Sequence, residues 1–178
     1  MTPYLLAGVV LVGLIGALNL ILTFGVIRRL REHDRALAGH PAPDQVLRIG
    51  DAVGDFAAVT VDGDPLTRAH LTGRTAVGFF STTCAPCLER LPEFVDYARA
   101  FPGGRDQVLV VVVTRQPEEA QDFVGQARSV ARVVVERFDG PIATAFAVTA
   151  FPTLALVDEG TTVAGGTTLE DLTAKTPA

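Results

Sequence analysis

The chain contains two cysteines, separated by only two residues: Cys84-Ala85-Pro86-Cys87. An apolar stretch precedes the pair and a stretch with helical periodicity follows it, so the cysteines are predicted to lie at the start of a helix. There the positive end of the helix dipole favours a thiolate at Cys84 and lowers its pKa. Cys87, one turn further along, can reach back and resolve a mixed disulfide on Cys84. The spacing therefore predicts dithiol–disulfide chemistry.

Other interpretations of the same pair are a structural disulfide, half of a zinc site, or chance placement. A disulfide across so short a loop would constrain the unfolded chain little. A structural zinc ion needs four ligands, yet the chain has no second cysteine pair. Its histidines (His33, His40 and His70) also lack metal-ligand spacing. We therefore expect a redox-active pair and no metal site.

An uncharged stretch over residues 3–27 is dominated by Leu, Val, Ile, Gly and Ala. As a helix it would span roughly 37 Å, enough to cross a hydrocarbon core of about 30 Å. A cleavable signal peptide is the alternative, but no basic residue precedes the stretch and it is longer than a usual signal core. We predict an uncleaved, single-pass transmembrane anchor at residues 1–27.

Two arguments about the side of the membrane conflict. Four arginines follow the anchor within residues 28–35, and the positive-inside rule then places the rest of the chain in the cytoplasm. Disulfide chemistry is instead typical of compartments outside the cytoplasm. The charge rule receives slightly more weight. Residues 28–45 are charged and then rich in Ala, Gly and Pro, which predicts a flexible linker before a folded domain at residues 46–178.

The net charge of −5 and the absence of a basic patch in the sequence argue against a nucleic-acid partner. Within the domain, unbroken apolar runs at 75–81 and 107–114 predict strands buried on both faces. Segment 53–61 ends at Asp62-Gly63, a hairpin signal. Further strands are expected over 132–136 (an edge strand), 153–157 and 161–164, and helices over 85–101, 117–129, 139–148 and 169–174. This order predicts an α/β domain whose sheet is covered by helices on both faces, with an N-terminal hairpin extension.

A second motif, Phe151-Pro152-Thr153, begins a predicted strand, where proline is tolerated and where an X-Pro bond can be cis. This motif, the segment from Phe79 to Cys87 and the following Pro92 together resemble the thioredoxin-like superfamily. The anchor and the N-terminal hairpin resemble its membrane-anchored thiol-disulfide oxidoreductases (the redoxin branch). The spacing Thr-Cys-x-x-Cys-x-x-x-Leu-Pro is most similar to the methylamine-dehydrogenase maturation type.

The resemblance implies a role for each motif residue. Cys84 is the attacking thiolate and Cys87 the resolving thiol. Pro152 is a cis-proline packed beside them, and Phe151 offers main-chain groups to an extended protein substrate. Such proteins transfer two electrons to or from a protein thiol or disulfide without a bound cofactor. The alternative is a redox-inactive thioredoxin-like binding module or a metallochaperone, although tethered copper chaperones of this superfamily separate their cysteines by three residues.

At three positions the sequence departs from the superfamily pattern. Thr83 stands where thioredoxins place a tryptophan, and Gly78 stands where many have a buried acid. Arg90 stands where tethered relatives often have a glutamate. The proton acceptor for Cys87 is therefore not identified. Arg90 is interpreted as a solvated residue on the helix face, the alternative being that it folds back to stabilise a thiolate.

Overall fold

The computed structural model describes Gly13 and residues 48–173. The chain divides into two compact units, Met1–Ala42 and Pro43–Ala178, and the account below concerns the second. The predicted anchor and linker lie outside the described residues, Gly13 apart. Within the part that is described, no helix has both the length and the apolar character needed to cross a membrane.

A five-stranded sheet forms the centre of the domain, in the order β5-β4-β3-β6-β7. Its strands are β3 (Arg74–Ser81), β4 (Val108–Val113), β5 (Arg132–Glu136), β6 (Thr153–Asp158) and β7 (Thr161–Gly166). Strands β3, β4 and β5 run parallel, whereas β6 and β7 are antiparallel to their neighbours. Every residue of β4 is buried, as its unbroken apolar run predicts, and β5 occupies the predicted edge position.

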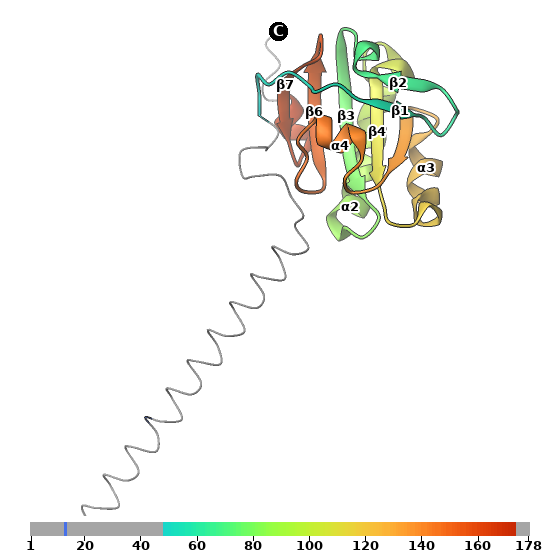
Figure 1. Ribbon diagram of the computed structural model, residues 1–178, viewed down its shortest axis with the longest axis vertical. Helices are drawn as coiled ribbons and strands as arrows, with labels where there is room; N and C mark the ends of the chain where they lie inside the picture. Colours follow the sequence, from blue (N-terminus) through green and yellow to red (C-terminus); the bar gives the residue numbers. More distant parts are fainter. Residues whose placement is uncertain (1–12, 14–47, 174–178) are drawn as a thin grey trace, which may run out of the picture. The chain divides into compact units, whose positions relative to one another are not determined.

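Helices cover both faces of this sheet (Figure 1). The elements are α2 (Ala85–Arg99), α3 (Gln121–Ala127), α4 (Pro141–Ala145) and α5 (Leu169–Thr173), with the hairpin strands β1 (Ala57–Val59) and β2 (Pro65–Thr67) and the short helices η1 (Arg68–His70), η2 (Gly104–Gln107) and η3 (Pro117–Ala120). On β3, Phe80 packs into one core with α2, α3 and α5. Its neighbour Phe79 packs into a second core with α4 and the hairpin, because successive strand residues point to opposite faces. The predicted two-sided covering and the hairpin are confirmed.

Three predicted helices differ in detail. The helix expected over 117–129 begins as the 3-10 turn η3 and becomes α-helical only in α3. The helix expected over 139–148 is reduced to α4, because Ala147 adopts a left-handed conformation (φ 51°) that ends it. The helix expected over 85–101 ends at Arg99. It continues through Pro92, which lies on its exposed side, where water can reach the carbonyl that loses its partner.

One segment, residues 50–61, crosses the second face of the sheet and bonds to both of its edges (Figure 1, teal); we call it the N-terminal strap. At one end the Gly50 N–H donates to the Thr162 carbonyl of β7 at 2.7 Å. At the other end the Val61 N–H donates to the Val133 carbonyl of β5 at 2.8 Å. The strap thus supplies hydrogen-bond partners to the two outer strands of the sheet, β5 and β7.

Candidate active site

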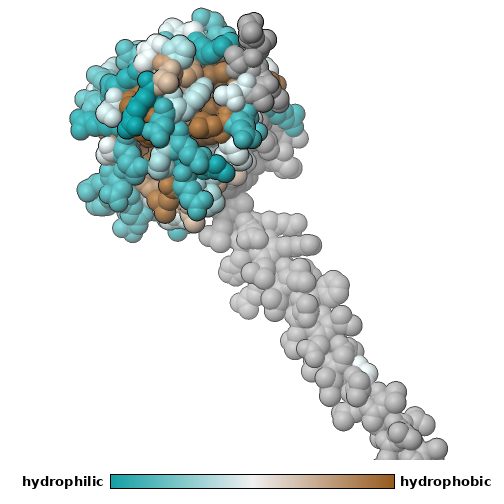
Figure 2. Space-filling view, turned by 180° about the vertical axis from the view of Figure 1, so that it is seen from behind, coloured by the Kyte–Doolittle hydropathy of each residue, from teal (hydrophilic) through white to brown (hydrophobic). Residues whose placement is uncertain are grey.

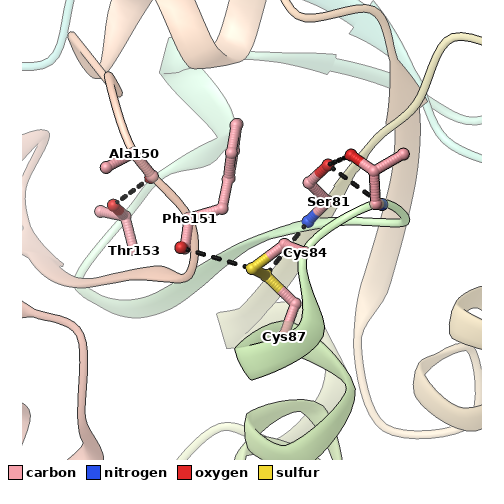
Figure 3. The surroundings of a disulfide bond; sticks show 7 residues. Ser81, Cys84, Cys87, Ala150, Phe151 and Thr153 are labelled. Atoms are coloured by element: carbon pink, nitrogen blue, oxygen red, sulfur yellow. Dashed lines mark hydrogen bonds between the residues drawn. A yellow bond between two sulfur atoms is a disulfide. The ribbon is translucent and has the colours of Figure 1, made fainter. Parts of the chain in front are cut away.

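The two cysteines lie where the sequence predicts them, at the first turn of α2, and they form a disulfide with their Cα atoms 5.3 Å apart (Figure 3). Cys84 is the N-cap residue, and no side chain caps this helix. Pro86 fills one of the first positions, where the missing N–H costs nothing. Cys84 is half-buried, whereas Cys87 is fully buried. An incoming sulfur can therefore reach Cys84 first.

The second motif faces the first across the end of the sheet. The Phe151–Pro152 peptide bond is cis, as predicted, and it directly precedes β6, the antiparallel neighbour of β3. The Phe151 carbonyl oxygen lies 3.4 Å from Cys84 Sγ (Figure 3), so a reduced Cys84 thiol can donate to it. The four predicted site residues, Cys84, Cys87, Phe151 and Pro152, are thus brought together from two segments far apart in the sequence.

Cys87 is surrounded mainly by apolar groups. It belongs to the first core, which includes Phe80 and Phe94. One polar contact reaches its sulfur: the Ser81 N–H donates to Cys87 Sγ at 3.4 Å, in a buried position. A Cβ placed on Gly78 would come within 2.7 Å of the Phe80 ring and 3.1 Å of the Phe94 ring. Aromatic rings thus fill the space that a side chain at position 78 would need.

A turn with three hydroxyl side chains leads from β3 into the cysteine pair. The Ser81 carbonyl accepts a hydrogen bond from the Cys84 N–H at 3.2 Å, and Ser81 Oγ accepts one from the Thr83 N–H at 3.4 Å. The hydroxyls of Ser81 and Thr83 also lie 3.2 Å apart. Beside them, Thr82 Oγ1 donates to Glu119 at 3.2 Å. Sequence reasoning missed Ser81, although the run Ser81-Thr82-Thr83 before Cys84 was a visible signal.

Comparison with solved structures identifies the fold. The thioredoxin domain of a thiol-disulfide oxidoreductase from Bacteroides vulgatus superposes with a TM-score of 0.58 at 20% identity, covering 71% of this chain and 94% of that one. A thio-disulfide isomerase from Thermus thermophilus gives 0.55 at 22% identity, covering 71% and 93%. StoA from Bacillus subtilis gives 0.52 at 20%, covering 69% and 95%.

The chain has the thioredoxin fold. No protein-family model and no curated protein matches its sequence. At this level of identity the likeness concerns the fold. The chemistry must therefore be argued from the cysteine pair and its surroundings.

Arg90 pairs with a residue of its own helix, α2. Its guanidinium forms an ion pair with Glu93 at 2.8 Å, one turn further along α2, and its side chain is 41% exposed. The Glu93 carboxylate raises the pKa of Arg90, mainly through this hydrogen bond. The interpretation of Arg90 as a solvated helix-face residue is confirmed.

Sequence reasoning also missed Glu136, a buried carboxylate at the end of β5. Its oxygens accept hydrogen bonds from the N–H groups of Ile142 (3.1 Å) and Ala143 (2.7 Å), at the start of α4. Burial raises the pKa of Glu136, and these two backbone bonds oppose the rise. The carboxylate fastens α4 to the end of β5, so its evident role is structural.

Apolar side chains also reach the surface of the domain. Figure 2 shows one face on which brown areas lie between hydrophilic side chains. Two of the large exposed apolar residues belong to the surroundings of the site. Leu88 follows Cys87 directly and is 58% exposed, and Phe138 packs edge-on against Phe151 with ring centres 5.2 Å apart. A molecule that reaches Cys84 therefore meets apolar as well as polar surface.

Proposed function

We propose that the protein is a thiol-disulfide oxidoreductase that exchanges a disulfide with a protein partner through Cys84 and Cys87. One observation carries the proposal: a half-buried Cys84 begins α2, within 3.4 Å of the carbonyl that precedes cis-Pro152, while Cys87 is buried behind it. The uncapped start of α2 favours a thiolate at Cys84 through the helix dipole and its first N–H groups. The main chain at Phe151 is placed to meet an extended partner segment.

In the reducing direction, the Cys84 thiolate attacks one sulfur of a partner disulfide. The partner's S–S bond breaks, a mixed disulfide forms, and the released thiolate takes a proton from water. Cys87 then loses its proton to water, and its thiolate attacks Cys84 Sγ. The Cys84–Cys87 bond forms, the mixed disulfide breaks, and the second partner sulfur leaves as a thiolate. Two electrons have passed to the partner, and the reverse sequence oxidises a partner dithiol.

Trapping of the mixed disulfide tests this proposal. With Cys87→Ser, a partner or glutathione captured on Cys84 cannot be released by resolution, so the adduct accumulates and is visible by mass spectrometry. The matched variant Cys84→Ser retains the buried thiol and should capture far less, because Cys87 is inaccessible. A folded Cys87→Ser protein that captures neither glutathione nor any cellular protein would overturn the proposal.

The reduction potential of the pair gives the direction of electron flow. A value near about −270 mV, as in thioredoxin, identifies a reductant that a second system must recharge. A value towards about −120 mV identifies an oxidant that donates its disulfide. Titration of the domain against thiol redox buffers distinguishes these two roles.

The finer assignment to the methylamine-dehydrogenase maturation type is part of the proposal, supported by the spacing from Thr83 to Pro92 and by the uncharged N-terminal stretch. We propose that residues 1–27 anchor the protein in a membrane. The flanking arginines favour a cytoplasmic domain and the resemblance favours the opposite side. An alkaline-phosphatase fusion after residue 40 distinguishes them, since the enzyme is active only outside the cytoplasm.

The alternative function is a redox-inactive binding module or a metallochaperone. Among the described residues, no group of three or more His, Cys, Asp or Glu side chains is arranged to hold a metal ion. The same trapping experiment discriminates, because a binding module would retain its partner with both cysteines replaced. An oxidoreductase would lose its capture when Cys84 is replaced.

A further inference from the structure

We propose that Ser81 is the positioning residue of the Cys84–Cys87 pair, and that its contacts set the thiolate stability of the pair and its rate of mixed-disulfide resolution. The inference rests on the proposed exchange function. Ser81 is the last residue of β3 and is only 6% exposed. Its partner in the parallel register is Val113 on the fully buried β4, and the N–H of the next residue, Thr82, donates to the Val113 carbonyl at 3.2 Å.

Figure 3 shows the Ser81 N–H directed at the Cys87 sulfur, whereas the Ser81 hydroxyl is directed at the turn before Cys84. The N–H donates to Cys87 Sγ, the carbonyl accepts from the Cys84 N–H, and the hydroxyl accepts from the Thr83 N–H while pairing with the Thr83 hydroxyl. One rigid residue therefore contacts the buried sulfur, the main chain of the other cysteine, and the residue before it. Loss of the Ser81 hydroxyl would free the Thr83 N–H and loosen the turn that holds Cys84 at the start of α2.

These contacts matter most when charge develops on sulfur. A disulfide sulfur is a weak acceptor, whereas a thiolate forms a charge-assisted hydrogen bond roughly twice as strong as a neutral one. During resolution Cys87 must become a thiolate inside an apolar core, where an unpaired charge is costly. The Ser81 N–H is the polar contact at that sulfur. Resolution is therefore the step that depends on the geometry of the turn.

Two pairs of variants test the inference. Ser81→Ala removes the hydroxyl and keeps the N–H. Thr83→Val removes the partner hydroxyl at an exposed position where folding is not at risk, and Thr83→Ser restores it. Thr75→Val is the matched control, because the Thr75 hydroxyl is also buried on β3 and donates to Gln107 at 2.8 Å, but at the other end of the strand.

The readouts are the pH profile of the ultraviolet thiolate absorbance and the rate at which a glutathione adduct on Cys84 is resolved. We expect Ser81→Ala to slow resolution about three- to tenfold and to raise the pKa of Cys84, as loss of one or two ordinary hydrogen bonds would. Thr83→Val should act in the same direction with a smaller effect, and Thr83→Ser should rescue it. Thr75→Val should lower the melting temperature alone.

The inference is overturned if Ser81→Ala and Thr83→Val lower the melting temperature as Thr75→Val does, yet leave the resolution rate and the pH profile of the parent protein unchanged. Should Ser81→Ala fail to fold, the two Thr83 variants decide the matter, since a hydroxyl-dependent change in rate supports the inference and an unchanged rate overturns it. Failure of the proposed function is a different result, because the parent protein itself would then form no glutathione adduct on Cys84.

Discussion

Helices α2 and α4 both follow the carboxyl end of a parallel strand, but the N–H groups of their first turns have different partners. At α2 the N-cap is Cys84, no side chain caps the helix, and the residue is half-buried. At α4 the backbone N–H groups of Ile142 and Ala143 are both bonded to the Glu136 carboxylate. The α4 terminus is closed by a buried anion of the chain itself. At the α2 terminus the first turn holds no acidic residue, so its positive potential acts on the Cys84 sulfur.

The buried acid of the described domain, Glu136, lies at the α4 terminus and not at the cysteine pair. Glu136 is the charged residue in the buried set of the described domain, and it lies at the end of β5, two strands away from β3, the strand that leads into the cysteine pair. Cys87 shares its core with the Phe80 and Phe94 rings. The carboxylate thus stabilises a helix, and the polar contact to the Cys87 sulfur comes from the main chain of Ser81.

The largest effect on activity is expected from Cys84→Ser. Without the attacking sulfur, disulfide exchange should fall to the background rate, measured by reduction of a protein disulfide. The ring closed by the disulfide is so short that its loss should lower the free energy of unfolding by about 2 kcal/mol or less. If Cys84→Ser instead lost much of its stability and kept its exchange activity, Cys84 would have a structural role and the comparison of the two helix termini would be wrong.

Glu136→Ala is expected to lower the stability of the domain and to leave its redox properties unchanged. Two buried N–H groups would lose their acceptor, so the free energy of unfolding should fall by about 2 to 4 kcal/mol, measured by urea denaturation. The reduction potential of the cysteine pair should stay unchanged. Glu136→Gln is the control because it keeps one oxygen acceptor. A shifted potential in either variant would show that the α4 terminus also acts on the redox site.

The pH dependence of stability should distinguish Glu136 from its neutral replacement. Burial raises the pKa of Glu136 above its ordinary value of 4.5, with a smaller contribution from exposed Asp139. As the pH rises through 4.5, the unfolded chain loses its proton first, so the wild type loses stability until the folded carboxyl is ionised as well. Relative to Glu136→Gln, the wild-type free energy of unfolding should therefore decline as the pH rises above about 4.5, and parallel curves would refute this.

The smallest effect is expected from Arg90→Ala. This side chain pairs with Glu93 across solvent-exposed helix surface, where ion pairs contribute little. Neither the melting temperature nor the pKa of Cys84 should change measurably. A raised pKa of Cys84 would instead mean that Arg90 folds back towards the thiolate in the reduced protein.

The parts of the fold that could be predicted are those that depend on the residue types within one short segment of the sequence. The unbroken Val-Leu-Val-Val-Val-Val run predicts the central strand β4. The helical periodicity after the cysteine pair predicts that the pair lies at the start of a helix. Pro152 could be placed beside the cysteines only through the resemblance to the thioredoxin-like superfamily, because proline at the start of a strand can be trans as well as cis.

The parts that could not be predicted depend on contacts between distant segments. Glu136 resembles a solvated residue of an edge strand, and only the docking of α4 buries its carboxylate. The role of Ser81 depends on the directions of its main-chain groups, which side-chain type does not specify. Helix α4 is shorter than predicted because Ala147 adopts a left-handed conformation. Alanine rarely adopts this conformation, so the sequence does not predict it.

The N-terminal strap has a consequence for the order in which the domain can be completed. Its two anchoring points are carbonyls of Thr162 on β7 and Val133 on β5, at opposite edges of the sheet and more than half a domain later in the sequence. The strap is synthesised before either edge exists, and its Gly50 end must wait for the C-terminal hairpin to form. The first residues of the domain to leave the ribosome are therefore among the last to find their native partners, and until then both outer strands are open to pairing with other chains.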